Sequence, residues 1–187
     1  MSTDATQSHQ PPESVHAHEY VWPEWVYPYP AGVVGGLLGG AAIALIGGSY
    51  GVVSCLNLFN LECIGPWLPV NLVAATVLRD MQAESLTVLM KYDLLALVVG
   101  LMIHVVMSIG LGEMFSFILP ALPGRPLFWG PVIGPLLWVG ASVAALPIIN
   151  PVMYANVELW SFALANVLYG LVLGWWIDRT PMMHVER

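Results

Sequence analysis

The stretch AGVVGGLLGGAAIALIGGSYGVVS, residues 31–54, decides the fold of this chain. It contains eight of the eighteen glycines of the chain and no charged residue. In water each glycine would cost an α-helix about 1 kcal/mol relative to alanine, so such a run would not hold a helix there. In a bilayer the backbone has no water to bond, and a helix satisfies its N–H and C=O groups internally. We therefore predict a transmembrane helix over residues 31–54.

The glycines of this helix recur at a spacing of four residues. Small residues at this spacing form a flat surface that another backbone can approach closely. Because they lie on several faces, we interpret residues 31–54 as the central helix, packed on more than one side. The alternative is ordinary small-residue content, since glycine is common in membrane helices. The glycines assigned to packing are Gly32, Gly35, Gly36, Gly39, Gly40, Gly47 and Gly51.

The composition is that of an integral membrane protein. Hydrophobic residues make up 58% of the 187 residues and charged residues only 9%, against about 25% charged in soluble domains. The net charge is −7 with five Lys and Arg, which argues against nucleic-acid binding. The first thirty residues lack Lys, Arg and an apolar run, so we expect no signal peptide and expect the first helix to direct insertion.

Three further apolar stretches, residues 93–119, 127–149 and 159–177, predict three more spans. Residues 55–91 contain no span of that length. There we expect one short helix from near Pro69 to Leu78, and a second that starts near Glu84 and runs into the next span. The predicted fold class is all-α: four transmembrane helices plus short interfacial helices, in a domain over residues 31–180.

The two ends of the chain have different compositions. Residues 1–19 are polar and are expected to be disordered, while residues 181–187 form a C-terminal tail. Residues 20–30, YVWPEWVYPYP, contain five aromatics and three prolines, which disfavour a regular helix and suit the headgroup layer. This segment either lies on the bilayer surface or docks on a partner subunit. The docking candidates are Trp22, Trp25, Tyr27 and Tyr29.

The basic residues favour one orientation. With four spans, both termini and the turn at 120–126 share one side of the membrane. That side has three arginines and the other side has two basic residues, which favours cytoplasmic termini in a bacterial inner membrane. The basic residues are Arg125, Arg179 and Arg187 on the first side, and Arg79 and Lys91 on the second.

The two cysteines, Cys55 and Cys63, would then face the periplasm, where a disulfide could close the intervening loop. Two buried free thiols are the alternative. Two cysteines exclude both a disulfide framework and a metal site built from four cysteines.

Polar side chains within the spans are costly, so each is a functional hypothesis. His104 and Glu113 are nine residues apart, about 180° around a helix, so we expect them to face different neighbours. They either serve as a proton relay, haem ligand or quinone contact, or only hydrogen-bond a neighbouring helix or a partner. A haem between two histidines would need a second intramembrane histidine, which the chain lacks; a lone axial ligand remains open. Ser108 extends a polar stripe from His104, and Asn166 and Tyr169 are interpreted as interhelical hydrogen-bond formers.

No catalytic motif is present. The sequence contains no phosphate loop, HExxH or CxxC, and no nucleophile–base constellation. His9, His16 and His18 lack further ligands for a metal. We therefore predict no catalytic residue, no metal site and no cofactor bound by this chain alone. A lipid or quinone at an interface remains open.

The motif GPWLPVNL at residues 65–72, followed by Ala74 and Ala75, is the most distinctive stretch. Further along come PALP at 120–123, RP at 125–126, WG at 129–130, PLLW at 135–138, NP at 150–151 and WSF at 160–162. In this order they resemble a family of small four-helix bacterial membrane proteins found with haem–copper oxidases, nitric-oxide reductases or alternative complex III. The resemblance covers roughly residues 33–174.

This resemblance implies an accessory subunit of a respiratory complex and transfers no catalytic residue. It implies catalytic, cytochrome-containing partner subunits that carry the haem and copper, together with membrane lipids. The alternative function is a small autonomous transporter or channel. The hydropathy pattern shows no inverted repeat, which weakens that alternative.

Overall fold

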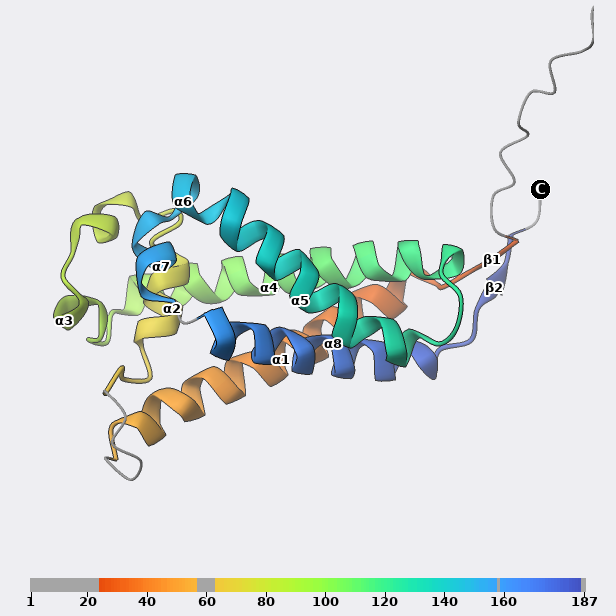
Figure 1. Cartoon of the computed structure of the whole chain (residues 1–187), viewed down its shortest axis with the longest axis horizontal. Coiled ribbons are helices and arrows are strands. Elements are labelled where there is room, and N and C mark those ends of the chain that lie inside the picture. Colours follow the sequence, from red (N-terminus) through yellow and green to blue (C-terminus); the bar gives the residue numbers. More distant parts are fainter. Residues whose placement is uncertain (1–23, 57–62, 158, 186–187) are drawn as a thin grey trace, which may run out of the picture.

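The computed structural model describes residues 24–56, 63–157 and 159–185. Four long helices dominate it: α1 (Tyr29–Ser54), α4 (Leu94–Ile118), α5 (Pro126–Ala144) and α8 (Leu159–Asp178) (Figure 1). All four are long and apolar enough to cross a membrane. At 1.5 Å per residue the shortest, α5, is about 28 Å long, close to the thickness of a hydrocarbon core. The prediction of an all-α membrane protein is confirmed.

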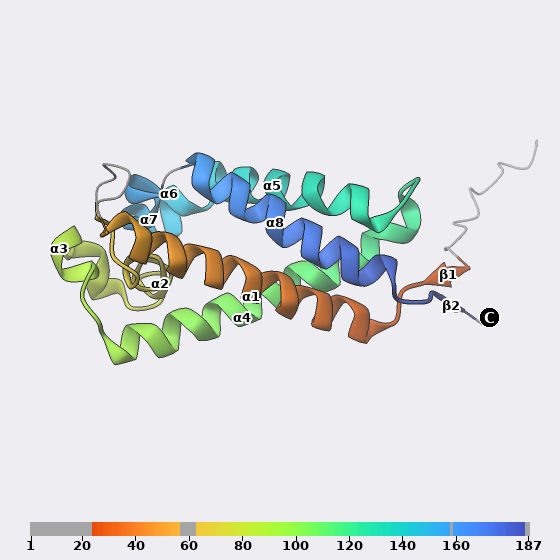
Figure 2. The same ribbon diagram turned by 90° about the horizontal axis from the view of Figure 1, so that it is seen from below.

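The helices alternate in direction along the bundle (Figures 1 and 2). The start of α1, the end of α8 and the turn between α4 and α5 lie at one end, as expected for four spans. A 3₁₀ turn, η2 (Leu119–Ala121), begins the α4–α5 connection. Beyond this end, strand β1 (Trp25–Val26) pairs antiparallel with β2 (Met183–His184). The C-terminal tail therefore includes a short strand that pairs with the aromatic segment.

The helix α1 begins earlier than expected, because Tyr29 and Pro30 belong to its first turn. Proline is tolerated there, since the first N–H groups of a helix have no intrahelical partner. The prediction that residues 20–30 contain no regular helix is therefore wrong for these two residues. Residues 1–23, including Trp22 and the segment expected to be disordered, lie outside the described residues.

The opposite end of the bundle carries a cluster of short helices that we call the cap (Figure 1). The expected helix near Pro69 is present but short. The predicted helix from Glu84 into the second span is wrong: α3 stops at Leu89, and Asp93 starts α4 by accepting a hydrogen bond from the Ala96 N–H at 2.9 Å. The cap consists of α2 (Leu68–Ala74), η1 (Arg79–Ala83), α3 (Leu86–Leu89), α6 (Leu146–Ile149) and α7 (Pro151–Asn156).

The third span is shorter than predicted. It ends at Ala144, and residues 146–149 form the separate helix α6. Pro147 explains the break, because its ring has no N–H to continue the ladder and clashes with the carbonyl one turn earlier. Pro131 and Pro135, in contrast, lie inside α5.

Helices α5 and α8 approach each other through glycines on both sides. A Cβ atom on Gly134 would lie 2.7 Å from the Asn166 carbonyl oxygen, and one on Gly174 would lie 2.6 Å from that of Pro126. Gly130 and Gly170 face each other so closely that neither could carry a side chain. Glycine spacing of four on both helices, 130–134 and 170–174, permits this backbone contact.

Two buried asparagines hold the cap together. Asn71 donates to the carbonyl oxygens of Leu89 and Lys91, at 2.6 and 2.9 Å. Asn150 donates to the Leu72 carbonyl oxygen at 2.7 Å and to the Thr76 hydroxyl at 2.9 Å. Its own Oδ1 accepts from the Met153 N–H at 3.0 Å, which caps α7. Around them pack four buried apolar side chains, Leu68, Leu72, Leu89 and Met153.

A disulfide joins Cys55, just after α1, to Cys63, just before the cap. The sequence left open a disulfide or two buried free thiols, and the structure contains the disulfide.

Asn150→Ala should destabilise the protein by about 2–4 kcal/mol, because it leaves buried backbone groups of α2 and α7 unpaired. Thermal unfolding in detergent measures the change. The matched control is Asn156→Ala, since among the described residues the Asn156 side chain bonds just the Val152 carbonyl oxygen of its own helix. Equal melting temperatures for the two variants would contradict the proposed role of Asn150.

Candidate functional site

Helix α1 packs against α4 through one face of glycines. A Cβ on Gly32 would lie 2.7 Å from the Ser116 hydroxyl oxygen, and one on Gly40 would lie 2.8 Å from the Ser108 Cβ. At Gly36 the Ser108 carbonyl group is closer still. Real Cβ atoms do not approach other atoms this closely, so these three positions require glycine for the observed contact.

A second face of α1 packs against α8. Cβ atoms on Gly35 and Gly39 would each lie 2.7 Å from a side chain of α8, that of Leu173 and of Tyr169 respectively. Near the end of α1, a Cβ on Gly51 would lie 2.5 Å from the Gly65 carbonyl oxygen, beside the cap. The interpretation of residues 31–54 as a central helix packed on more than one side is confirmed.

The assignment of Gly47 to packing is wrong. A Cβ atom at Gly47 or at the neighbouring Gly48 would meet no described atom within 4 Å. The reason is local: the second half of α1 diverges from α4 and α8 (Figure 1), so the spacing of four continues here without a contacting helix, and only Gly51 meets the cap.

Polar groups join α1, α4 and α8 at one level, which we call the helix junction. The Nε2 atom of His104 on α4 lies 2.9 Å from the Gly40 carbonyl oxygen of α1. The Tyr169 hydroxyl of α8 donates to the Ser108 carbonyl oxygen of α4 at 2.7 Å. His104 and Tyr169 thus both contact a neighbouring helix. The Asn166 side chain instead donates to the Phe162 carbonyl oxygen of its own helix at 2.9 Å, and it makes no hydrogen bond to another helix among the described residues, so that prediction is wrong.

Glu113 lies at the other end of the same interface. A Cβ on Gly32 would lie 2.8 Å from its Oε1, which is buried and has no hydrogen-bond partner among the described residues. The expectation that His104 and Glu113 face different neighbours is wrong, because both reach α1. They occupy opposite flanks of one wide contact, with Ser108 and Gly112 between them.

The aromatic docking candidates differ in exposure. The side chains of Trp25 and Tyr29 are 51% and 70% exposed, and Trp25 meets the His184 ring edge-on at 5.2 Å. Tyr27 instead packs against the buried core formed by α1, α4 and α8. Burial and the nearby charge of Asp178 raise the pKa of its phenol.

An ion pair closes the same end of the bundle. Arg125, before α5, donates through two nitrogens to the Asp178 carboxylate at the end of α8. This hydrogen bond and the carboxylate charge raise the pKa of the Arg125 guanidinium. Because Arg125 is largely exposed, solvent screens the pair and its contribution to stability is small.

The interior of the described bundle offers little room for a ligand. The cavity between α4, α5 and α8, beside Tyr169 and Asn166, has a volume of only about 10 Å³, which is at most one water. No group of three or more His, Cys, Asp or Glu side chains that could hold a metal occurs among residues 24–56, 63–157 and 159–185. What the junction does is hold three helices together.

Two sets of structural residues were not assigned from the sequence. The first is the pair Asn71 and Asn150, which appeared only within motifs; an Asn directly before Pro151 was the available signal for a helix cap. The second is the glycine pairs of α5 and α8, which were detectable by their spacing of four. The comparisons add nothing to this: no family model, curated protein or solved structure matches the chain.

Gly36→Leu should destabilise the protein by about 1–3 kcal/mol or prevent its assembly, because the side chain would enter the α4 backbone. Thermal unfolding in detergent checks this. Gly110→Leu is the control, since a Cβ at Gly110 on α4 meets nothing within 4 Å. If both variants melt like the parent protein, the close contact of α1 and α4 is not what the geometry indicates.

Proposed function

We propose that this chain is a non-catalytic accessory subunit of a membrane respiratory complex of the haem–copper oxidase or alternative complex III type. Its task is to stabilise the assembly by helix packing, while haem and copper belong to the partner subunits. The observation that carries the structural part of this proposal is the helix junction, where His104 and Tyr169 contact carbonyl oxygens of neighbouring helices.

What these polar side chains bond to distinguishes an accessory subunit from a transporter or channel. A transporter or channel needs polar groups that line a continuous path. Here His104 and Tyr169 contact carbonyl oxygens of neighbouring helices, and Asn166 bonds its own helix. The cavity beside Tyr169 holds at most one water. These contacts favour a packing role over transport.

The motifs behind the family resemblance also have structural roles in this fold. Asn71 and Asn150 bind backbone groups of the cap. Trp138 of α5 stacks on Phe162 of α8, with ring centroids 4.9 Å apart. A family defined by such residues shares an architecture, which agrees with a packing role, while the choice of a respiratory complex as partner is what the resemblance implies.

The disulfide supports an orientation. Disulfides persist in oxidising compartments, so the cap end carrying Cys55 and Cys63 faces the periplasm in our proposal. The opposite end, with both termini and Arg125, then faces the cytoplasm of a bacterial inner membrane.

A matched pair of exposed alanines tests this orientation. Ala83→Cys lies in the cap and Ala121→Cys lies in the turn between α4 and α5. A membrane-impermeant maleimide added to intact cells should label Ala83→Cys, and should label Ala121→Cys only after permeabilisation. The reverse pattern would place the termini outside.

Purification from native membranes in mild detergent tests the function. The tagged chain should elute with haem absorption bands and with cytochrome polypeptides identified by mass spectrometry. His104→Gln should keep the same haem content per chain, because its amide can still donate to the Gly40 carbonyl oxygen. A free, monodisperse chain without cytochromes would refute the accessory role and favour the transporter. Loss of haem from an otherwise intact His104→Gln complex would make His104 a ligand.

A further inference from the structure

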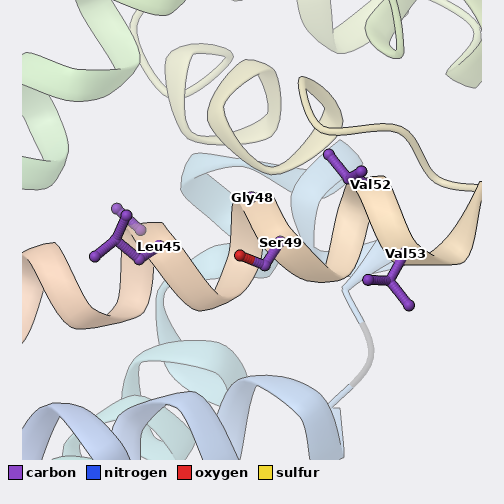
Figure 3. Close-up of a pocket in the computed structure, with 6 residues that line it drawn as sticks. Leu45, Gly48, Ser49, Val52 and Val53 are labelled. Carbon is purple, nitrogen blue, oxygen red and sulfur yellow. The ribbon is translucent and has the colours of Figure 1, made fainter.

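The outer half of α1, residues 44–54, has little lateral support within the described chain. It diverges from α4 and α8 (Figure 1), and of its residues only Gly51 and Ser54, close to its end, are buried. The described residues that line a shallow hollow on it, Leu45 and Ser49 among them, all belong to α1 itself (Figure 3). Segments with few buried contacts are the ones that open locally. The position of the outer half therefore depends on how its end is attached.

The end of α1 is attached to residues 63–66, which lead into the cap and which we call the entry segment. A Cβ on Gly51 would lie 2.5 Å from the Gly65 carbonyl oxygen, so the two backbones are in close contact here. The Ser54 hydroxyl oxygen accepts a hydrogen bond from the Ile64 N–H at 3.2 Å. Both contacts require the entry segment to stay beside the end of α1.

The disulfide holds the entry segment in that place covalently. It keeps the Cα atoms of Cys55 and Cys63 4.3 Å apart. Without it, the eight residue steps between the two cysteines could span up to about 28 Å. Both cysteines are exposed, and exposed disulfides are the labile ones in exchange with thiols. The bridge is thus the tightest restraint on the end of α1, and thiols can reach it.

The cap has contacts of its own that do not involve this disulfide. Its buried side-chain hydrogen bonds come from Asn71 and Asn150. Helix α2 packs on the first turns of α4, where a Cβ on Gly100 would lie 2.5 Å from the Val70 carbonyl oxygen. Because none of these contacts involves α1, opening the disulfide should free the end of α1 while the cap stays folded on α4.

We propose that the Cys55–Cys63 disulfide is a redox-sensitive tether, which fixes the outer half of α1 to the cap when oxidised and releases it when a dithiol reduces it. One thiolate of the dithiol attacks a sulfur of the bridge, which breaks the bond between the cysteines and forms a mixed disulfide. The second thiolate attacks this mixed disulfide, and the reductant leaves as a disulfide. Two electrons and two protons thus pass to the protein, whose cysteines end as thiols. The tether does not depend on which complex the chain joins.

Distance measurements between spin labels test the tether in the full chain in lipid nanodiscs. The labels are attached to a ketone-bearing residue introduced at exposed positions, so the cysteines remain unmodified. The first pair joins Val52, in the outer half of α1, to Val106 of α4, and the control pair joins Leu38, in the packed half, to the same Val106. Dithiothreitol should broaden the Val52–Val106 distance distribution and leave the Leu38–Val106 distribution unchanged. Alkylation and mass spectrometry verify that both cysteines have become thiols.

A variant with both Cys55→Ser and Cys63→Ser supplies the released state without reductant. Its Val52–Val106 distribution should be as broad as that of the reduced protein and should not respond to dithiothreitol. Three results would overturn the tether. The disulfide could resist dithiothreitol in the folded protein, the Val52–Val106 distribution could stay unchanged after full reduction, or both label pairs could broaden together, which would make the disulfide a requirement of the whole fold.

Discussion

The close contact between the backbones of α1, α4 and α8 is the constraint on which this structure depends. At Gly36 and Gly39 the central helix lies directly against Ser108 of α4 and Tyr169 of α8. Within a bilayer no hydrophobic force drives helices together, because lipid chains are as apolar as the helices themselves. Association relies on dispersion contacts and hydrogen bonds, and both require short distances between backbones. Glycine permits those distances.

The same distances explain how the polar groups of the spans are used. The Tyr169 hydroxyl reaches the Ser108 carbonyl oxygen, and the His104 ring reaches that of Gly40, because no side chain separates the helices at these points. The cap is stabilised separately, at one end of the bundle. There Asn71 bonds carbonyl oxygens at the end of α3 and in the α3–α4 connection, and Asn150 bonds backbone groups of α2 and α7. Much of the remaining apolar side-chain surface of the four long helices faces outward, where membrane lipids would contact it.

The sequence predicted some features of this site and missed others for identifiable reasons. The glycine spacing correctly indicated that α1 is packed on two sides, since spacing depends only on helix geometry. It wrongly included Gly47, because spacing cannot say where a neighbouring helix ends. His104 and Glu113 were separated by an angle of about 180° around their helix, yet both reach α1, because an interface between close-packed helices is broad. Asn166 was predicted to hydrogen-bond another helix, but its amide donates to the Phe162 carbonyl oxygen, one turn earlier in α8.

The sequence by itself determined that four apolar segments form membrane-spanning helices, since leaving backbone groups unpaired in lipid is too costly. An even number of spans then puts the start of α1 and the end of α8 at the same end of the bundle. It also determined that prolines divide the connecting segments. Only the tertiary structure decided which glycines are in contact, that Cys55 and Cys63 are bridged, and that Gly47 and Gly48 have no neighbour while Gly51 contacts the cap. Those outcomes depend on the distance between segments remote in sequence, and no local pattern of residues specifies that distance.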